Sequence, residues 1–147
     1  MATLRTGSAA LSFVLDTHII SELMRPQPHP RVLQRYLDHQ AQMALPAPAW
    51  HEVNYRCLRL PAGKRRTALQ DFLNQVAGKL PKLAYDAAAA LVHAQLRAEA
   101  SAKRRVLPKL DAQIAAIAIT QGLTLVTRNT RDFEGLAGLR LASWYED

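Results

Sequence analysis

With 147 residues, the chain is long enough for one ordinary domain, and its 49% hydrophobic and 21% charged residues are typical of a globular protein rather than a disordered one. The single cysteine, Cys57, excludes an internal disulfide and a cysteine-based zinc cluster, and the absence of any run of 18 apolar residues predicts that no segment spans a membrane. The formal charge of +7 favours polyanions such as nucleic acids, and equally an acidic protein partner.

The N-terminal residues do not have the pattern of a signal peptide. The apolar run 9–15 is short and continues directly into Asp16, with no small-residue cleavage pattern after it. We therefore expect residues 1–10 to form a flexible extension, residues 11–147 to form a single domain, and the protein to be cytoplasmic.

Short apolar segments alternate with helical patterns along the rest of the chain. In chain order, the patterns predict a strand at 12–15, helices at 17–25 and 31–40, a strand at 42–48, helices at 49–60 and 64–77, a strand at 81–86, helices at 87–100 and 110–121, and strands at 123–127 and 139–143. Pro26 and Gly122 mark two of the helix ends. This alternation predicts an α/β fold: a three-layer αβα sandwich around a central, mainly parallel sheet of four to five strands.

Acidic and amide side chains follow the predicted strands or begin the predicted helices. Asp16 comes directly after the first strand, Asn129 and Asp132 follow the strand 123–127, and Glu52 and Asp111 lie near helix starts. In open α/β sheets, ligands bind outside the carboxyl ends of the strands, so these side chains are expected to converge. Converging carboxylates repel one another unless a cation lies between them, and hard oxygen ligands suit Mg²⁺ or Mn²⁺ rather than zinc.

Each acid also has a purely structural interpretation. Asp16 and Asp111 are both placed where a side chain caps a helix, and Glu52 is a favourable charge in a first helical turn. Asp132 is an ordinary loop residue by type. Composition and spacing leave both interpretations open.

Taken together, four motifs resemble one family. They are LDTHIISEL (15–23), HE (51–52), LDAQIAAIAI (110–119) and LTLVTRNTRDF (123–133), and in order and spacing they resemble the PIN domain of VapC-type toxins. The tail LRLASW extends the resemblance over Phe13 to Trp144. It implies a PIN-like fold and a cytoplasmic, Mg²⁺-dependent endoribonuclease toxin, with Mn²⁺ able to substitute. It also implies that the protein cleaves a loop of a structured RNA (a transfer or ribosomal RNA), is neutralised by a small VapB-like antitoxin, and forms a homodimer.

The same resemblance assigns roles to particular residues. Asp16 and Asp111 would be the principal Mg²⁺ ligands, with Glu52 completing the acidic cluster directly or through water. Asn129 would be the fourth catalytic position; the family often has an acid there, so this departure puts a second metal in doubt, and Asp132 is close enough in sequence to compensate. His18 stands where the family usually has Asn.

Basic and apolar surfaces suggest where partners bind. We expect RNA contacts from Arg128 and Arg131, which flank the site, and from Lys103, Arg104 and Arg105, although runs of charge are often only solvated. Glu22 is expected to be a surface charge, and His93 a surface or packing residue. An apolar stripe is either part of the core or, as the resemblance implies, a groove for the antitoxin and a dimer contact; it contains Trp50, Tyr55, Leu58–Leu60, Leu69 and Phe72.

Other protein classes fit less well. A phosphatase of the aspartate-nucleophile type needs a second Asp where this chain has His18, and a dinucleotide-binding domain needs a glycine-rich turn after the first strand. The alternative that stays open is a non-catalytic RNA- or protein-binding PIN module, because Asn129 replaces an acid.

Overall fold

The structure is a computed structural model that describes residues 10–146. Five strands form one parallel sheet in the order β3-β2-β1-β4-β5, with β1 at its centre. Their bounds are β1 (Phe13–Leu15), β2 (Met43–Pro46), β3 (Lys82–Leu83), β4 (Thr124–Val126) and β5 (Arg140–Ala142). The predicted fold class is confirmed, and the sheet has five strands, all of them parallel.

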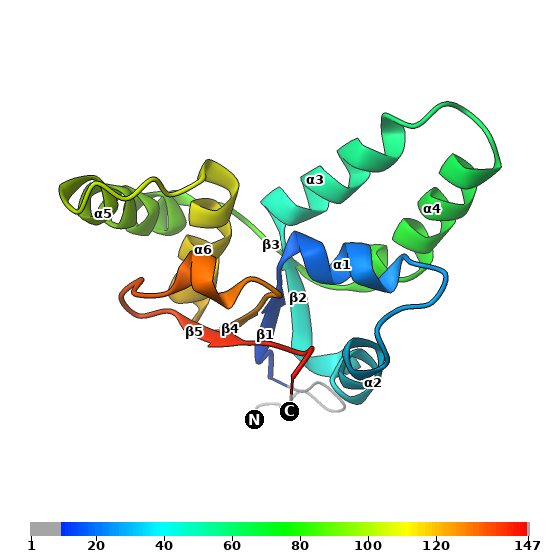
Figure 1. The fold of residues 1–147 in the computed structure, drawn as a ribbon, viewed down its shortest axis with the longest axis horizontal. Coiled ribbons are helices and arrows are strands. Elements are labelled where there is room, and N and C mark those ends of the chain that lie inside the picture. The colour runs from blue at the N-terminus through cyan, green and yellow to red at the C-terminus, as the bar shows by residue number, and fades with distance from the viewer. Residues whose placement is uncertain (1–9, 147) are drawn as a thin grey trace, which may run out of the picture.

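Six α-helices flank this sheet. They are α1 (Thr17–Leu23), α2 (Pro30–Asp38), α3 (Ala47–Leu58), α4 (Lys64–Gln75), α5 (Ala87–Ala102) and α6 (Lys109–Gln121). Figure 1 shows α5 and α6 together on one side of the strands, and α1 to α4 on the other. Three short 3₁₀ turns also occur, at Gln40–Gln42, Ala77–Lys79 and Thr130–Phe133.

The apolar core has two parts because side chains of a strand alternate between the two faces of a sheet. Leu15 of β1 packs with the helices α1 to α4, in a cluster that includes Ile19, Val32 and Leu73. Val14, its neighbour on β1, packs on the opposite face against Ile114 of α6. The central strand is therefore covered on both faces, as its unbroken apolar sequence predicts.

Local sequence signals explain where the helices begin and end. Asp16 accepts a hydrogen bond from the Thr17 amide at the start of α1, and Asp86 accepts one from Ala89 at the start of α5. Gly122 ends α6 in the left-handed conformation, with φ 67°. Because all strands run parallel, Asp16 and the starts of α3, α5 and α6 lie at the same edge of the sheet, which we call the carboxyl edge.

None of the described helices has the length and apolar character needed to cross a membrane. The expected N-terminal extension, residues 1–10, falls almost wholly outside the described residues, so the domain boundary stays a prediction.

Candidate active site

Asp16 is a buried carboxylate fixed by two hydrogen bonds at the end of β1. Its side chain is almost inaccessible, with 3% of the residue exposed. Oδ1 accepts a hydrogen bond from the Thr17 amide at 2.7 Å, and Oδ2 accepts one from the Thr127 hydroxyl at 2.8 Å. Asp16 therefore caps α1 and is also held by the residue that follows β4, so both interpretations of Asp16 are structurally compatible.

Thr127 connects the two loops of the site. Its hydroxyl donates to Asp16 and accepts from the backbone amide of Asn129 at 3.1 Å. The side chain is completely buried, so this arrangement has no competition from water. Thr127 thus orients the Asp16 carboxylate, while the exposed amide side chain of Asn129 makes no hydrogen bond with the described residues.

Asp111 lies in the first turn of α6 and is influenced by two other carboxylates. Partial burial raises the pKa of Asp111, and the negative charges of Asp16 and Asp132 raise this pKa further, whereas His18 lowers it. The charges of Asp16, which follows β1, and of Asp132, in the turn after β4, therefore both act on Asp111 of α6. The structure places Asp16, Asp111 and Asp132, all named in the sequence analysis, near enough for their charges to interact.

His18 lies half-exposed beside this group. Its Nδ1 is 3.6 Å from Asp16 Oδ2, an ion-pair contact that is slightly longer than a hydrogen bond. The interaction with Asp16 raises the pKa of His18 more than burial lowers it, Asp111 raises it further, and Arg56 opposes them. A protonated His18 would therefore offset part of the negative charge of the acidic group.

Glu52 is turned to a neighbour on its own helix instead of to the other acids. Its Oε2 is 3.0 Å from Nε of Arg56, one helical turn later on α3. Across residues 10–146, no three His, Cys, Asp or Glu side chains stand close enough together to form a ready-made metal site. The predicted triad of Asp16, Glu52 and Asp111 is therefore brought to one edge of the sheet without being closed around a cation.

Arg56 is a residue of this site that sequence reasoning missed. It pairs with Glu52, and its charge lies near enough to His18 to lower the pKa of that ring. The spacing Glu52 to Arg56 is the i,i+4 pattern of a helical ion pair, and this was the available signal.

The five basic residues predicted to contact RNA fall into two groups. Lys103, Arg104, Arg128 and Arg131 are exposed. Arg105 is different, because its guanidinium donates to the carbonyl oxygens of Asp132 (2.9 Å) and Glu134 (2.6 Å). Arg105 therefore ties the loop before α6 to the loop that carries Asp132.

The expectation that Glu22 is a surface charge is wrong. Only 4% of this residue is exposed, and its carboxylate accepts hydrogen bonds from Arg25, the His29 amide and the Tyr145 hydroxyl. Burial alone would raise the pKa of Glu22, but these donors together lower it. Tyr145 is 123 residues away in the sequence, so no local pattern indicates this pairing.

Comparisons with known proteins give one consistent result. A family profile described as "PIN domain" matches residues 13–139. The "VapC ribonuclease Y4jK" of Sinorhizobium fredii (strain NBRC 101917 / NGR234) is 38% identical over 141 residues, which cover 90% of this chain and 97% of that protein. The "tRNA(fMet)-specific endonuclease VapC" of Shigella flexneri is 33% identical over 134 residues, covering 91% and 98%.

Solved structures agree with the sequence relatives. A chain from DNA-bound VapBC of Salmonella typhimurium has a TM-score of 0.80 and 29% identity, over 91% of this chain and 98% of that one. A chain from FitAcB of Neisseria gonorrhoeae has a TM-score of 0.78 and 30% identity, over 92% and 99%.

Proposed function

The chain belongs to the PIN-domain family, and from this premise we propose that it is a toxin of the VapC type: an Mg²⁺-dependent endoribonuclease that cleaves a structured RNA and is neutralised by a small antitoxin. The observation that carries the proposal is the position of Asp16, Asp111 and Asp132 at the carboxyl edge of the sheet, where the charges of Asp16 and Asp132 act on Asp111. The name of the Shigella flexneri relative favours a transfer RNA as substrate.

The donor atoms of the site fit a hard divalent cation. Asp16 and Asp111 offer carboxylate oxygens, and burial together with the negative charges of Asp16 and Asp132 raises the pKa of Asp111, which a cation would oppose. Among residues 10–146, the Thr17 hydroxyl next to Asp16 is buried and has no hydrogen-bond partner. We assign Asp16 and Asp111 as the principal ligands; Glu52 would join through water after separating from Arg56.

The residues of the chain prepare this site before substrate arrives. The Thr17 amide and the Thr127 hydroxyl fix the direction of the Asp16 carboxylate, and Arg105 holds the loop that presents Asp132. When bound, Mg²⁺ would lower the pKa of a water molecule and stabilise the negative charge that develops on the phosphate. Because water is the nucleophile, the products should carry a 5′-phosphate and a 3′-hydroxyl.

The exposed cations supply the affinity for RNA that the acidic centre cannot supply. Arg128 and Arg131 follow β4, and Lys103 and Arg104 precede α6, so both pairs border the carboxyl edge. We propose that they bind phosphates around an RNA loop, whose bases and backbone are free to reach in-line geometry. Arg105 is left out of this set because its guanidinium is already engaged.

The antitoxin is proposed to bind beside α3 and α4. Tyr55 and Leu58 of α3 are half exposed (49% and 52%), in agreement with an apolar surface that lacks a cover in the single chain. The similar structures are VapBC and FitAcB complexes, which supports an antitoxin and, with the family, a homodimer. Co-purification with the product of an adjacent small reading frame, and sedimentation of the toxin alone, test these two proposals.

The decisive experiment is cleavage of transfer RNA by purified protein with Mg²⁺ or with a chelator. We expect cleavage only with Mg²⁺, and none by Asp16→Asn or Asp111→Asn with far-ultraviolet circular dichroism unchanged. Full activity of either variant, activity in the chelator, or 2′,3′-cyclic phosphate ends would refute the mechanism. A chain that takes up no Mg²⁺ and binds RNA uncut would support the non-catalytic alternative that Asn129 suggests.

A further inference from the structure

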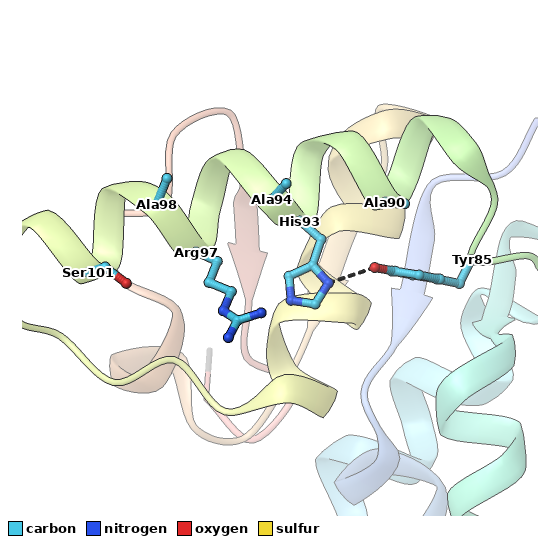
Figure 2. Close-up of a pocket in the computed structure, with 7 residues that line it drawn as sticks. All are labelled: Tyr85, Ala90, His93, Ala94, Arg97, Ala98 and Ser101. Carbon is cyan, nitrogen blue, oxygen red and sulfur yellow. Dashed lines mark hydrogen bonds between the residues drawn. The ribbon is translucent and has the colours of Figure 1, made fainter.

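An open pocket of about 460 Å³ lies along α5, outside the acidic group. Its polar lining is Tyr85, His93, Arg97 and Ser101, and the rest of the lining is alanine. Figure 2 shows the His93 ring and the Arg97 guanidinium extending from the same side of α5, with the Tyr85 hydroxyl directed at His93. The pocket therefore combines an aromatic ring, two nitrogen-rich side chains and a hydroxyl.

His93 pairs with Tyr85 at one side of this pocket. The Tyr85 hydroxyl lies 2.7 Å from His93 Nδ1. Burial lowers the pKa of His93 below its ordinary value, and the positive charges of Arg97 and Lys109 lower it further, which favours the neutral ring. A neutral ring that accepts the phenol proton at Nδ1 carries its own proton on Nε2, where it is available to a ligand.

Among the described residues, those that line the pocket include one permanent cation, Arg97, and no acid. Within residues 10–146, Arg97 has no carboxylate partner, and the charges that act on His93 are both cations. Of the acids near these residues in sequence, Asp86 already caps α5 through the Ala89 amide, and Glu99 lines a different pocket. An anionic group is the ligand that this set of donors would bind.

The position of the pocket connects it to the proposed active site. Tyr85 follows β3 at the carboxyl edge, and Lys109 begins α6 two residues before Asp111. Two residues correspond to about 3 Å of rise along a helix, so Lys109, whose charge acts on His93 of the pocket, is close along α6 to the proposed ligand Asp111.

We propose that the pocket of Tyr85, His93, Arg97 and Ser101 binds a phosphodiester of single-stranded RNA that flanks the cleavage site. Arg97, His93 Nε2 and the Ser101 hydroxyl donate to the phosphate oxygens, and the exposed part of Tyr85 contacts the adjoining ribose or base. The proposal rests on the ribonuclease function proposed above and extends its substrate path to α5.

A second copy of this chain is a less favourable occupant. A two-fold contact over this pocket would place Arg97 and Lys109 near the same cations of the other copy, and burying like charges is costly. The alanine side chains would permit close packing, so the test must detect this outcome as well.

The test measures RNA affinity in the Asp111→Asn background, which is expected to leave the RNA intact. The probes are a fluorescein-labelled 12-nucleotide single-stranded RNA and a transfer RNA transcript, titrated at two salt concentrations. Adding Arg97→Gln should weaken binding of the single strand about three- to tenfold and reduce the salt slope by about 0.7. Ala94→Met, an exposed substitution that fills the pocket without changing charge, should weaken it by a similar factor.

The matched control is Lys79→Gln, which removes one positive charge before β3, at the edge of the sheet opposite the site. It should change affinity less than twofold. Equal effects of Arg97→Gln and Lys79→Gln, or no measurable RNA binding by the parent, would overturn the proposal. So would a change of oligomeric state by sedimentation in Ala94→Met, because it would identify the pocket as a contact between copies.

The same data separate the two proposals. If Asp111→Asn still cleaves RNA, the proposed active site fails whatever Arg97→Gln does. If Asp111→Asn is inactive and Arg97→Gln behaves like the control, only the α5 pocket fails.

Discussion

Glu22 is the residue whose surroundings differ most from what its type suggests. The carboxylate accepts hydrogen bonds from Arg25 at 3.0 Å, from the His29 amide at 2.9 Å and from the Tyr145 hydroxyl at 3.2 Å. Arg128 lies over the Tyr145 ring, 4.8 Å from its centre, and burial raises the pKa of Tyr145 to about 12, helped by Glu22. This buried acid thus links α1, the turn after it and the C-terminal segment.

Glu22→Gln should destabilise the protein in a pH-dependent way. Since the donors lower the folded-state pKa below its ordinary value of 4.5, the ionised group contributes stability above pH 4.5, and this contribution is lost as pH falls through the folded-state pKa. Urea unfolding at pH 7 should show a loss of about 1–3 kcal/mol in the free energy of unfolding.

The difference between Glu22→Gln and the parent should shrink as the pH is lowered below 4.5. Glu99→Gln, which changes an exposed acid of α5, serves as the control and should have no effect at either pH. If the free energy of unfolding of Glu22→Gln differs from that of the parent by the same amount at every pH, the charge of Glu22 is not what stabilises the fold.

Asp132 and Asn129 should have opposite effects on metal binding. Asp132 already acts on Asp111 through its charge, whereas Asn129 brings only an amide. Asp132→Asn should raise the Mn²⁺ concentration for half-maximal cleavage several-fold, and Asn129→Asp should lower it, since added negative charge favours the cation. Calorimetric titration of Mn²⁺ checks both; equal affinity in all three proteins would place both residues outside the cation's surroundings.

At the scale of elements, Gly122 is the clearest case of a helix end set by one residue. It adopts φ 67° after α6, and a Cβ added there would meet no atom within 4 Å. Gly122→Ala should therefore cost about 1 kcal/mol from backbone strain alone, and Gly122→Asn less, because Asn tolerates this conformation better. Thermal unfolding of the two variants shows which of them is more stable. A larger loss of stability in Gly122→Asn than in Gly122→Ala would contradict this prediction.

The elements themselves were predictable because their signals are local. Pro26, Asp86 and Gly122 act within a turn of their own position, and the helices and strands were found to within a few residues. The partners of side chains were not predictable in the same way. Arg105 reads as a solvated cation until the fold places Asp132 and Glu134 carbonyls beside it, 27 and 29 residues away.

In the candidate site, too, the positions of residues were predictable and their side-chain partners were not. Asp16 and Asp111 were found because strand ends and helix starts of a parallel sheet meet at one edge, which is a property of the topology. The pairing of Glu52 with Arg56, and the effect of the Asp132 charge on Asp111, depend on rotamers and loop paths that the sequence pattern does not determine. The pocket at His93 was missed for the same reason: Tyr85, His93 and Lys109 come from three segments.

Across the whole molecule, charge is distributed in a way that favours function over stability. The chain has a formal charge of +7, yet its carboxyl edge gathers Asp16, Asp111 and Asp132 within one field. An acid whose pKa is raised on folding destabilises the folded state once it is ionised. This loss of stability is present above the folded-state pKa and disappears as the pH falls below it. Bound Mg²⁺ should also remove this loss of stability, because it neutralises the charge of the carboxylates.

Asp111→Asn should therefore stabilise the metal-free protein at pH 7 while abolishing cleavage. A gain of about 1 kcal/mol, typical of removing a strained functional group, corresponds to a rise of about 2–4 °C in Tm. Mg²⁺ should raise the Tm of the parent and have little effect on the variant. Lowering the pH through the raised pKa of Asp111 should narrow the difference in Tm between the two metal-free proteins. Glu134→Gln, an exposed acid of the neighbouring loop, is the control for loss of one negative charge. A variant that is less stable than the parent without metal, or that gains as much Tm from Mg²⁺, would show that Asp111 neither suffers repulsion from its neighbours nor binds the cation.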